Sequence, residues 1–223
     1  MTDDVPGVDA RRRFLDERRE ICRRRFDTMH APVYDDRWGG YLNPTHERCV
    51  RDLVSTLPSG ARVLDAACGT GKYWPVLLEA GAEVVGTDQS RAMLDVALAK
   101  HPSVVTHCVA LHELTGLIGF DAVLCIDAIE NVGPEDWPLV VAGLRGAMRS
   151  GGTAYLTVEL PDPDDPDVPD DTDAPLVTGE VISGGAYHYF PSVAEATTLL
   201  RDGGFRVDSM IEGDGYAHFL LSA

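Results

Sequence analysis

The sequence predicts an α/β domain in which helices cover both faces of a mostly parallel sheet. Strand-like and helix-like segments alternate from residue 62 onward, as in a doubly wound arrangement. The first strand-like run ends in an acidic residue, and a glycine-rich turn follows it. Two final strands flank Gly213-Asp214-Gly215, which predicts an antiparallel hairpin. With 223 residues, 44% of them hydrophobic, the chain can bury a core.

The N-terminal segment, residues 1–43, predicts a helix followed by an aromatic lid. Apolar side chains recur at helical spacing over residues 9–29. Arginines and acids occupy the other faces of this helix. We interpret them as a solvated face with local ion pairs, and a basic partner-binding helix is the alternative. The lid segment is a loop over residues 34–41 that contains Tyr34, Trp38 and Tyr41.

Residues 44–223 predict the main domain. Asn43 as N-cap and Pro44 at the first helical position begin a helix that runs to about Leu57. Ser192 and Glu195 form a capping box for a later helix. We expect the other helices near 71–80, 90–100, 134–149 and 192–202. We expect strands near 62–66, 83–87, 103–108, 120–126, 153–159, 205–211 and 216–222, with a turn at 150–152 and an extended segment at 181–190.

An acidic, proline-rich stretch interrupts the domain at residues 161–178. Its prolines block helix formation and strand pairing, and its aspartates repel one another. We therefore expect a mobile inserted loop. A calcium site is the alternative interpretation, but the spacing lacks the ordered ligands and terminal glutamate of a calcium loop.

The charge distribution indicates a small-molecule partner. The formal net charge is −17, whereas proteins that bind nucleic acid carry a basic surface. Residues 1–60 hold 11 basic and 11 acidic groups, so the remaining 8 basic and 25 acidic groups carry the whole −17. We see no secretory signal and no apolar stretch near the roughly 20 residues that span a bilayer. Five cysteines without C-x-x-C spacing predict reduced thiols in a cytoplasmic protein.

The glycine-rich turn predicts a site for an adenosine-containing cofactor. Asp65 ends the first strand, and Gly69-Thr70-Gly71 lets the backbone approach a ligand that a Cβ would collide with. Asp88 ends the next strand, and an acid about 20 residues beyond such a turn commonly binds a ribose.

These features resemble the class I S-adenosylmethionine-dependent methyltransferases over about residues 44–223. The resemblance rests on the stretch from Asp65 to Gly71, on Asp88 and on the C-terminal hairpin. It implies a Rossmann-like, doubly wound, seven-stranded sheet whose last strand runs antiparallel to its neighbours. A nicotinamide-dependent reductase is the competing interpretation, but its motif needs a third glycine where this chain has Lys72-Tyr73-Trp74.

The resemblance also implies which residues bind S-adenosyl-L-methionine. The first acid reaches the methionine end, and the second accepts charge-assisted hydrogen bonds from the ribose hydroxyls. Ala67 stands where the family has a glycine, and Ala110-Leu111 lacks the acid of the third motif. An aromatic lid suits a sulfonium through cation–π attraction, and aromatic packing of the N-terminal helix is the alternative. The expected cofactor-binding residues are Asp65, Ala67, Gly69, Thr70, Gly71, Asp88, Gln89, Met93, Ala110, Leu111, Asp127, Tyr34 and Tyr41.

The expected catalytic residues are His188, Glu130 and Asn131. A hydroxyl or amine acceptor needs a base near neutral pH, and we favour His188, which follows the inserted loop. A histidine hydrogen-bonded within an aromatic patch is the alternative. Glu130 and Asn131 follow the fourth strand, where residues of the family line the methyl-transfer site. Asp127 and Glu130 offer two metal ligands, but no third is evident, so we expect no metal.

The resemblance implies methyl transfer to an O or N atom of a small-molecule acceptor, giving S-adenosylhomocysteine. The motifs of methyltransferases that act on nucleic-acid bases are absent, which agrees with the acidic charge. We expect a monomer or homodimer with neither a nucleic-acid nor a membrane partner. The alternative is a cofactor-binding homologue with a non-methylating or regulatory role.

Overall fold

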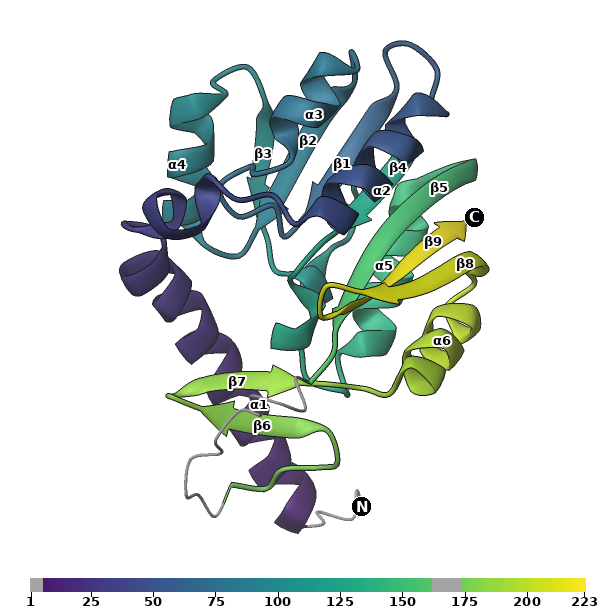
Figure 1. Cartoon of the computed structure of the whole chain (residues 1–223). Coiled ribbons are helices and arrows are strands. Elements are labelled where there is room, and N and C mark those ends of the chain that lie inside the picture. Colours follow the sequence, from purple (N-terminus) through teal and green to yellow (C-terminus); the bar gives the residue numbers. More distant parts are fainter. Residues whose placement is uncertain (1–5, 162–173) are drawn as a thin grey trace.

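A seven-stranded sheet forms the centre of the computed structural model, which describes residues 6–161 and 174–223 (Figure 1). Its strands are β1 (Arg62–Ala66), β2 (Glu83–Asp88), β3 (Val105–Cys108), β4 (Phe120–Cys125), β5 (Met148–Glu159), β8 (Arg206–Gly213) and β9 (Tyr216–Ser222). The spatial order is β3-β2-β1-β4-β5-β9-β8, and β9 alone runs antiparallel to its neighbours. The predicted sheet with its antiparallel C-terminal hairpin is confirmed.

Helices cover both faces of this sheet. They are α2 (Pro44–Ser55), α3 (Trp74–Glu79), α4 (Arg91–Lys100), α5 (Trp137–Ala147) and α6 (Val193–Asp202). A further helix, α1 (Pro6–Arg25), extends beyond the edge of the sheet (Figure 1). One buried cluster packs α2, α3 and α4 against one face, and a second packs α5 and α6 against the other. Successive residues of β1 serve both clusters, because Val63 belongs to one and Leu64 to the other. The strand is therefore apolar along its length, as in buried parallel strands.

Two predicted helix caps are present. Asn43 Oδ1 accepts hydrogen bonds from the backbone N–H groups of Thr45 (2.9 Å) and His46 (3.1 Å) at the start of α2. Ser192 Oγ accepts one from the N–H of Glu195 (3.1 Å) at the start of α6. Each bond satisfies a backbone donor that has no partner within the helix.

Three predicted boundaries were wrong. The helix expected from residue 71 begins at Trp74, because Gly69 and Gly71 hold left-handed backbone conformations. The turn expected at 150–152 lies within β5, which starts at Met148 and meets β4 with an irregular register. The lid expected as a loop contains the short π-helical turn η2 (Asp35–Gly39), which follows another, η1 (Phe26–His30).

A second, two-stranded sheet packs beside α1. The extended segment predicted at 181–190 forms the hairpin of β6 (Glu180–Ser183) and β7 (Ala186–Tyr189), which lies across α1 (Figure 1). The acidic insertion predicted at 161–178 falls mostly outside the described residues, since 162–173 are not among them. No helix within the described part of the chain is both long and apolar enough to cross a membrane.

Ion pairs attach α1 to the main domain. Arg11 donates two hydrogen bonds to Glu135 (2.7 and 2.9 Å) and also contacts Glu180. Arg19 donates two to Asp136 (2.8 and 2.7 Å).

The expected local ion pairs are present, for example between Arg23 and Glu20. Arg11 and Arg19, however, bind acids far away in the chain, and Arg19 also pairs locally with Asp16. Paired N–H donors that face one carboxylate make these contacts directional.

The ring of Trp74 secures the turn between β1 and β2. This fully buried side chain donates a hydrogen bond from Nε1 to Asp65 Oδ2 at 2.9 Å. Its ring also lies over Gly86 of β2, where an added Cβ would be 2.4 Å from Trp74 Cζ2. Trp74, which follows the glycine turn, thus packs against Gly86, a strand position where a larger residue would not fit.

We predict that Gly86→Ala destabilises the protein by about 1–3 kcal/mol, the usual cost of overpacking a core. Gly146→Ala in α5 is the matched control, because an added Cβ there meets nothing within 4 Å. The control should leave stability unchanged or raise it by up to about 1 kcal/mol. Urea unfolding checks both variants, and equal stability of Gly86→Ala and wild type would contradict the packing argument.

The buried Asp65 makes the ligand-free protein sensitive to pH. Burial raises the pKa of Asp65 to about 7, and the hydrogen bond from Trp74 only partly opposes this. A group whose pKa is raised in the folded state favours folding at low pH, and this contribution is lost as pH rises to the folded pKa. The loss is on the order of 1.4 kcal/mol per pKa unit.

We therefore predict that the melting temperature of the ligand-free protein falls between about pH 5 and pH 7.5, because Asp65 ionises in a buried place. Asp65→Asn keeps an acceptor for Trp74 without the charge, and its melting temperature should fall less over this range. Calorimetric melts in matched buffers measure both. Parallel curves for wild type and variant would show that Asp65 does not cause the dependence.

Candidate active site

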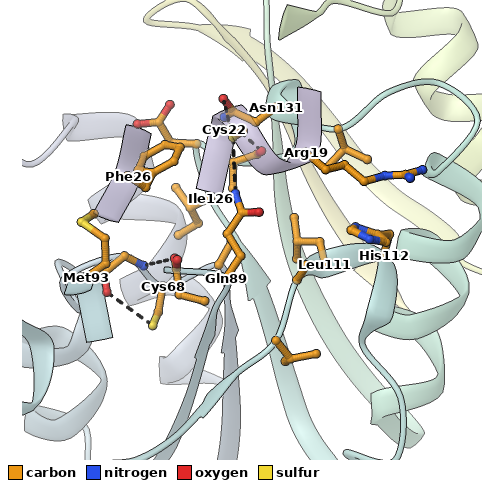
Figure 2. A pocket seen from close by; sticks show the side chains of 18 of the residues that line it. Arg19, Cys22, Phe26, Cys68, Gln89, Met93, Leu111, His112, Ile126 and Asn131 are labelled. Carbon is orange, nitrogen blue, oxygen red and sulfur yellow. Dashed lines mark hydrogen bonds between the residues drawn. The ribbon is translucent and has the colours of Figure 1, made fainter. Parts of the chain in front are cut away.

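A cavity of about 100 Å³ lies where β1, β2 and β4 end (Figure 2). The carboxyl ends of parallel strands meet at one edge of a sheet, so residues distant in sequence line it together. Eleven of the residues predicted for cofactor binding or catalysis line this cavity: Tyr34, Asp65, Ala67, Gly69, Asp88, Gln89, Met93, Ala110, Leu111, Asp127 and Asn131.

The turn after β1 brings the backbone close to the cavity. Gly69 has a φ of +54°, and an added Cβ would lie 3.2 Å from Cε of Met93. Ala67 has a φ of +57°, although it carries a Cβ. Ala67 stands where the family has a glycine, so its left-handed conformation strains the backbone at this turn.

Asp88 connects this turn to α4. Its Oδ2 accepts the N–H of Gly69 at 2.9 Å, and its Oδ1 accepts the N–H of Ser90 at 2.8 Å. Burial raises the pKa of Asp88 to about 6, and these two hydrogen bonds limit the rise. Each carboxylate oxygen has two lone pairs, so Asp88 can accept further hydrogen bonds from a ligand in the cavity.

The segment from α1 to η2 covers the cavity. We extend the name lid from residues 34–41 to this whole segment. Asp27 Oδ1 accepts hydrogen bonds from Ser90 Oγ (2.7 Å) and from the N–H of Ala92 (3.2 Å). Asp35 accepts one from Thr70 Oγ1 (2.7 Å) and forms an ion pair with Lys100 (2.7 Å). In Figure 2 Gln89 points at Cys22 of α1, and its Nε2 lies 3.3 Å from Sγ.

Three residues predicted for the cofactor lie outside the cavity lining. The hydroxyl of Thr70 holds the lid through Asp35. Gly71 lies beneath the ring of Trp74, and a Cβ added to Gly71 would lie 2.6 Å from Trp74 Cδ2. Tyr41 is 60% exposed, and its ring faces Lys72 at 5.9 Å. Lid residues such as Cys22 and Phe26 line the cavity instead, and only their place on the apolar face of the predicted helix could have indicated this.

A second cavity of about 380 Å³ adjoins the first. Asp127, Asn131 and Tyr34 line both. His188 of β7 lines only the second, and its ring stacks on Phe190 with centroids 5.7 Å apart. Aromatic rings also line it from the lid and from β7: Phe26, Tyr34, Trp38 and Tyr187.

Three carboxylates gather where the cavities meet. Asp127, Glu130 and Glu159 each offer an oxygen within 4.8 Å of the others. Asn131 Nδ2 donates to Glu130 Oε1 at 2.8 Å, whereas the buried Oε2 has no hydrogen-bond partner among the described residues. Burial and the charges of Asp127 and Glu159 raise the pKa of Glu130 well above its usual range. Sequence analysis missed Glu159, because only the alignment of β5 beside β4 brings it here. The expectation of no metal stays a prediction.

Known proteins resemble this chain in sequence and fold. Residues 63–152 match the model of a family described as "Methyltransferase domain". A ubiquinone biosynthesis O-methyltransferase of Alkalilimnicola ehrlichii is 30% identical over 71% of this chain and 65% of its own length. A second, from Bordetella avium, is 30% identical over 52% of this chain and 49% of its own length. The chain thus spans less than two thirds of these relatives.

A solved structure supports the fold. The 1,6-didemethyltoxoflavin-N1-methyltransferase of Burkholderia thailandensis, with bound 1,6-didemethyltoxoflavin and S-adenosylhomocysteine, superposes with a TM-score of 0.68 over 93% of this chain and 89% of its own, at 19% identity. At 19% identity, this similarity supports the fold alone. The family match, which covers β1 to the start of β5, agrees with it. Residues 63–152 thus match a methyltransferase domain, and the sheet order around them is the fold shared with S-adenosylmethionine-dependent methyltransferases of known structure.

Proposed function

We propose that this chain transfers a methyl group from S-adenosyl-L-methionine to an O or N atom of a small-molecule acceptor, giving S-adenosylhomocysteine. One observation carries the proposal: the buried carboxylate of Asp88 lies beside Gly69 in a cavity that shares lining residues with a second one. The names of the relatives from ubiquinone and toxoflavin chemistry also favour a small acceptor. A net charge of −17 argues against a nucleic acid.

The first cavity has the groups that this cofactor requires. Asp88 has lone pairs left for two ribose hydroxyls, and Gly69 leaves space that a Cβ would fill. Met93, Ala110 and Leu111 would flank the adenine. Bound there, the cofactor supplies a methyl group already activated by a positively charged sulfur. The chain itself mainly supplies orientation and exclusion of water, the second through the lid.

The second cavity would hold the acceptor. We propose that His188 takes the proton from the attacking hydroxyl or amine at a ring nitrogen, and that Glu130 and Asn131 orient the acceptor. Glu130 is a second candidate base, because burial raises its pKa and so makes its carboxylate a stronger proton acceptor. We still expect a monomer or homodimer that acts in the cytoplasm and needs no metal.

Labelled methyl transfer tests the function. The protein, incubated with methyl-deuterated S-adenosylmethionine and a panel of small phenols, amines and carboxylic acids, should yield a deuterated product in mass spectrometry.

Asp88→Ala should lower the affinity for S-adenosylhomocysteine about 10- to 100-fold in calorimetry, because it removes hydrogen bonds to a charged group. Asp95→Ala removes an exposed acid on α4, the helix that follows Asp88; it is the control and should bind normally. Stoichiometric binding without product on any acceptor would favour the regulatory alternative.

We predict that His188→Phe lowers kcat for the acceptor found in this way about 10²- to 10⁴-fold, the range typical of a lost general base. The variant keeps an aromatic ring to stack on Phe190. Affinity for S-adenosylhomocysteine should not change, because His188 lines only the second cavity. Steady-state kinetics and calorimetry measure the two effects. A normal kcat would remove His188 as the base, and Glu130→Gln would then be the variant to measure.

A further inference from the structure

The last strand of the sheet delivers a side chain to the site. Because β9 runs antiparallel, its first residue lies at the edge where the parallel strands end. That residue is Tyr216, which pairs with Glu159 at the end of β5. Its hydroxyl donates a hydrogen bond to Asp127 Oδ1 at 2.6 Å. Tyr216 itself is not among the residues that line either cavity, so it reaches the site through Asp127.

Asp127 is held from both ends. Its backbone N–H donates to Oγ1 of the fully buried Thr157 at 2.8 Å, and its side chain accepts from Tyr216. The residue has a φ of +54°, a conformation that a side chain disfavours but that aspartate tolerates better than most. Two hydrogen bonds therefore fix one carboxylate where the two cavities meet.

The ring of Tyr216 is supported in turn. It packs edge-on against the ring of His46, with centroids 4.6 Å apart. Nδ1 of His46 is hydrogen-bonded to the hydroxyl of Tyr73 at 3.0 Å. Burial and the nearby charges of His218 and Lys72 lower the pKa of His46 to about 3, so this ring stays neutral. A neutral, packed support gives Tyr216 little freedom to leave Asp127.

We propose that Tyr216 is a positioning residue that holds the Asp127 carboxylate for the α-ammonium group of the methyl donor. This inference rests on the proposed function. The adenosine side of the first cavity is already assigned to Asp88 and to the residues around Met93, which leaves the ends of β1 and β4 for the methionine end. Asp127 lines this end, and an oxygen of Glu159 lies within 4.8 Å of an Asp127 oxygen, so the negative charge there suits a cation.

The test compares two ligands that differ at the methionine end. S-Adenosylhomocysteine carries the ammonium group, whereas 5′-methylthioadenosine lacks the whole amino-acid end. We expect Tyr216→Phe to weaken binding of S-adenosylhomocysteine about tenfold in calorimetry, within the range for hydrogen bonds to charged groups, and to leave 5′-methylthioadenosine within twofold of wild type. Asp127→Asn should behave alike. The double variant should lose little more than Asp127→Asn alone, because both residues act through one contact.

Tyr189→Phe is the matched control, because it removes a buried tyrosine hydroxyl that bonds Glu195 away from both cavities. It should bind both ligands as wild type does. An equal loss of both ligands in Tyr216→Phe, or no loss of either, would overturn the inference while leaving the proposed function intact. Wild-type protein that binds neither ligand would contradict the proposed function itself and this inference with it.

Discussion

The carboxylate of Asp88 joins the parts of the molecule that build the site. One oxygen accepts the N–H of Gly69 in the turn after β1, and the other accepts the N–H of Ser90 at the start of α4. The hydroxyl of Ser90 in turn donates to Asp27 of the lid. Asp88 thus binds the glycine turn and the start of α4, and Ser90 binds the lid. These hydrogen bonds keep the glycine turn, α4 and the lid in one arrangement around the cavity.

This arrangement has an energetic cost. Burial raises the pKa values of Asp65, Asp88 and Glu130, so keeping these acids ionised opposes folding of the ligand-free chain. Ala67 and Asp127, at the ends of β1 and β4, also hold left-handed backbone conformations. Strain and buried acids therefore concentrate around the two adjoining cavities, a pattern typical of binding sites. A ligand that carries positive charge would relieve part of the electrostatic cost.

Much of the fold could be predicted because its signals are local. Alternating strand and helix patterns, the caps at Asn43 and Ser192 and the turn before β9 each depend on neighbours in sequence. The structure also gives a reason for rejecting the reductase interpretation. At the position where a third glycine would stand, the Trp74 ring fills the space above Gly86.

The parts that escaped prediction depend on contacts between distant segments. The β6–β7 hairpin has two short strands, and its place is set by packing on α1. The long-range ion pairs of Arg11 and Arg19 cannot be told from local ones in a helix rich in both charges. Glu159 and Tyr216 lie near Asp127 only because β5 ends, and the antiparallel β9 begins, at the edge of the sheet where β4 ends. No spacing in the sequence brings them together.

A crystal structure of the chain with S-adenosylhomocysteine is the most direct test of the central claim that the Asp88 cavity is the cofactor site. We predict ribose hydroxyls on the Asp88 carboxylate, adenine beside Met93 and Leu111, and the amino-acid end between β1 and β4. Adenosine bound elsewhere, with Asp88 contacting only the backbone of Gly69 and Ser90, would contradict the claim.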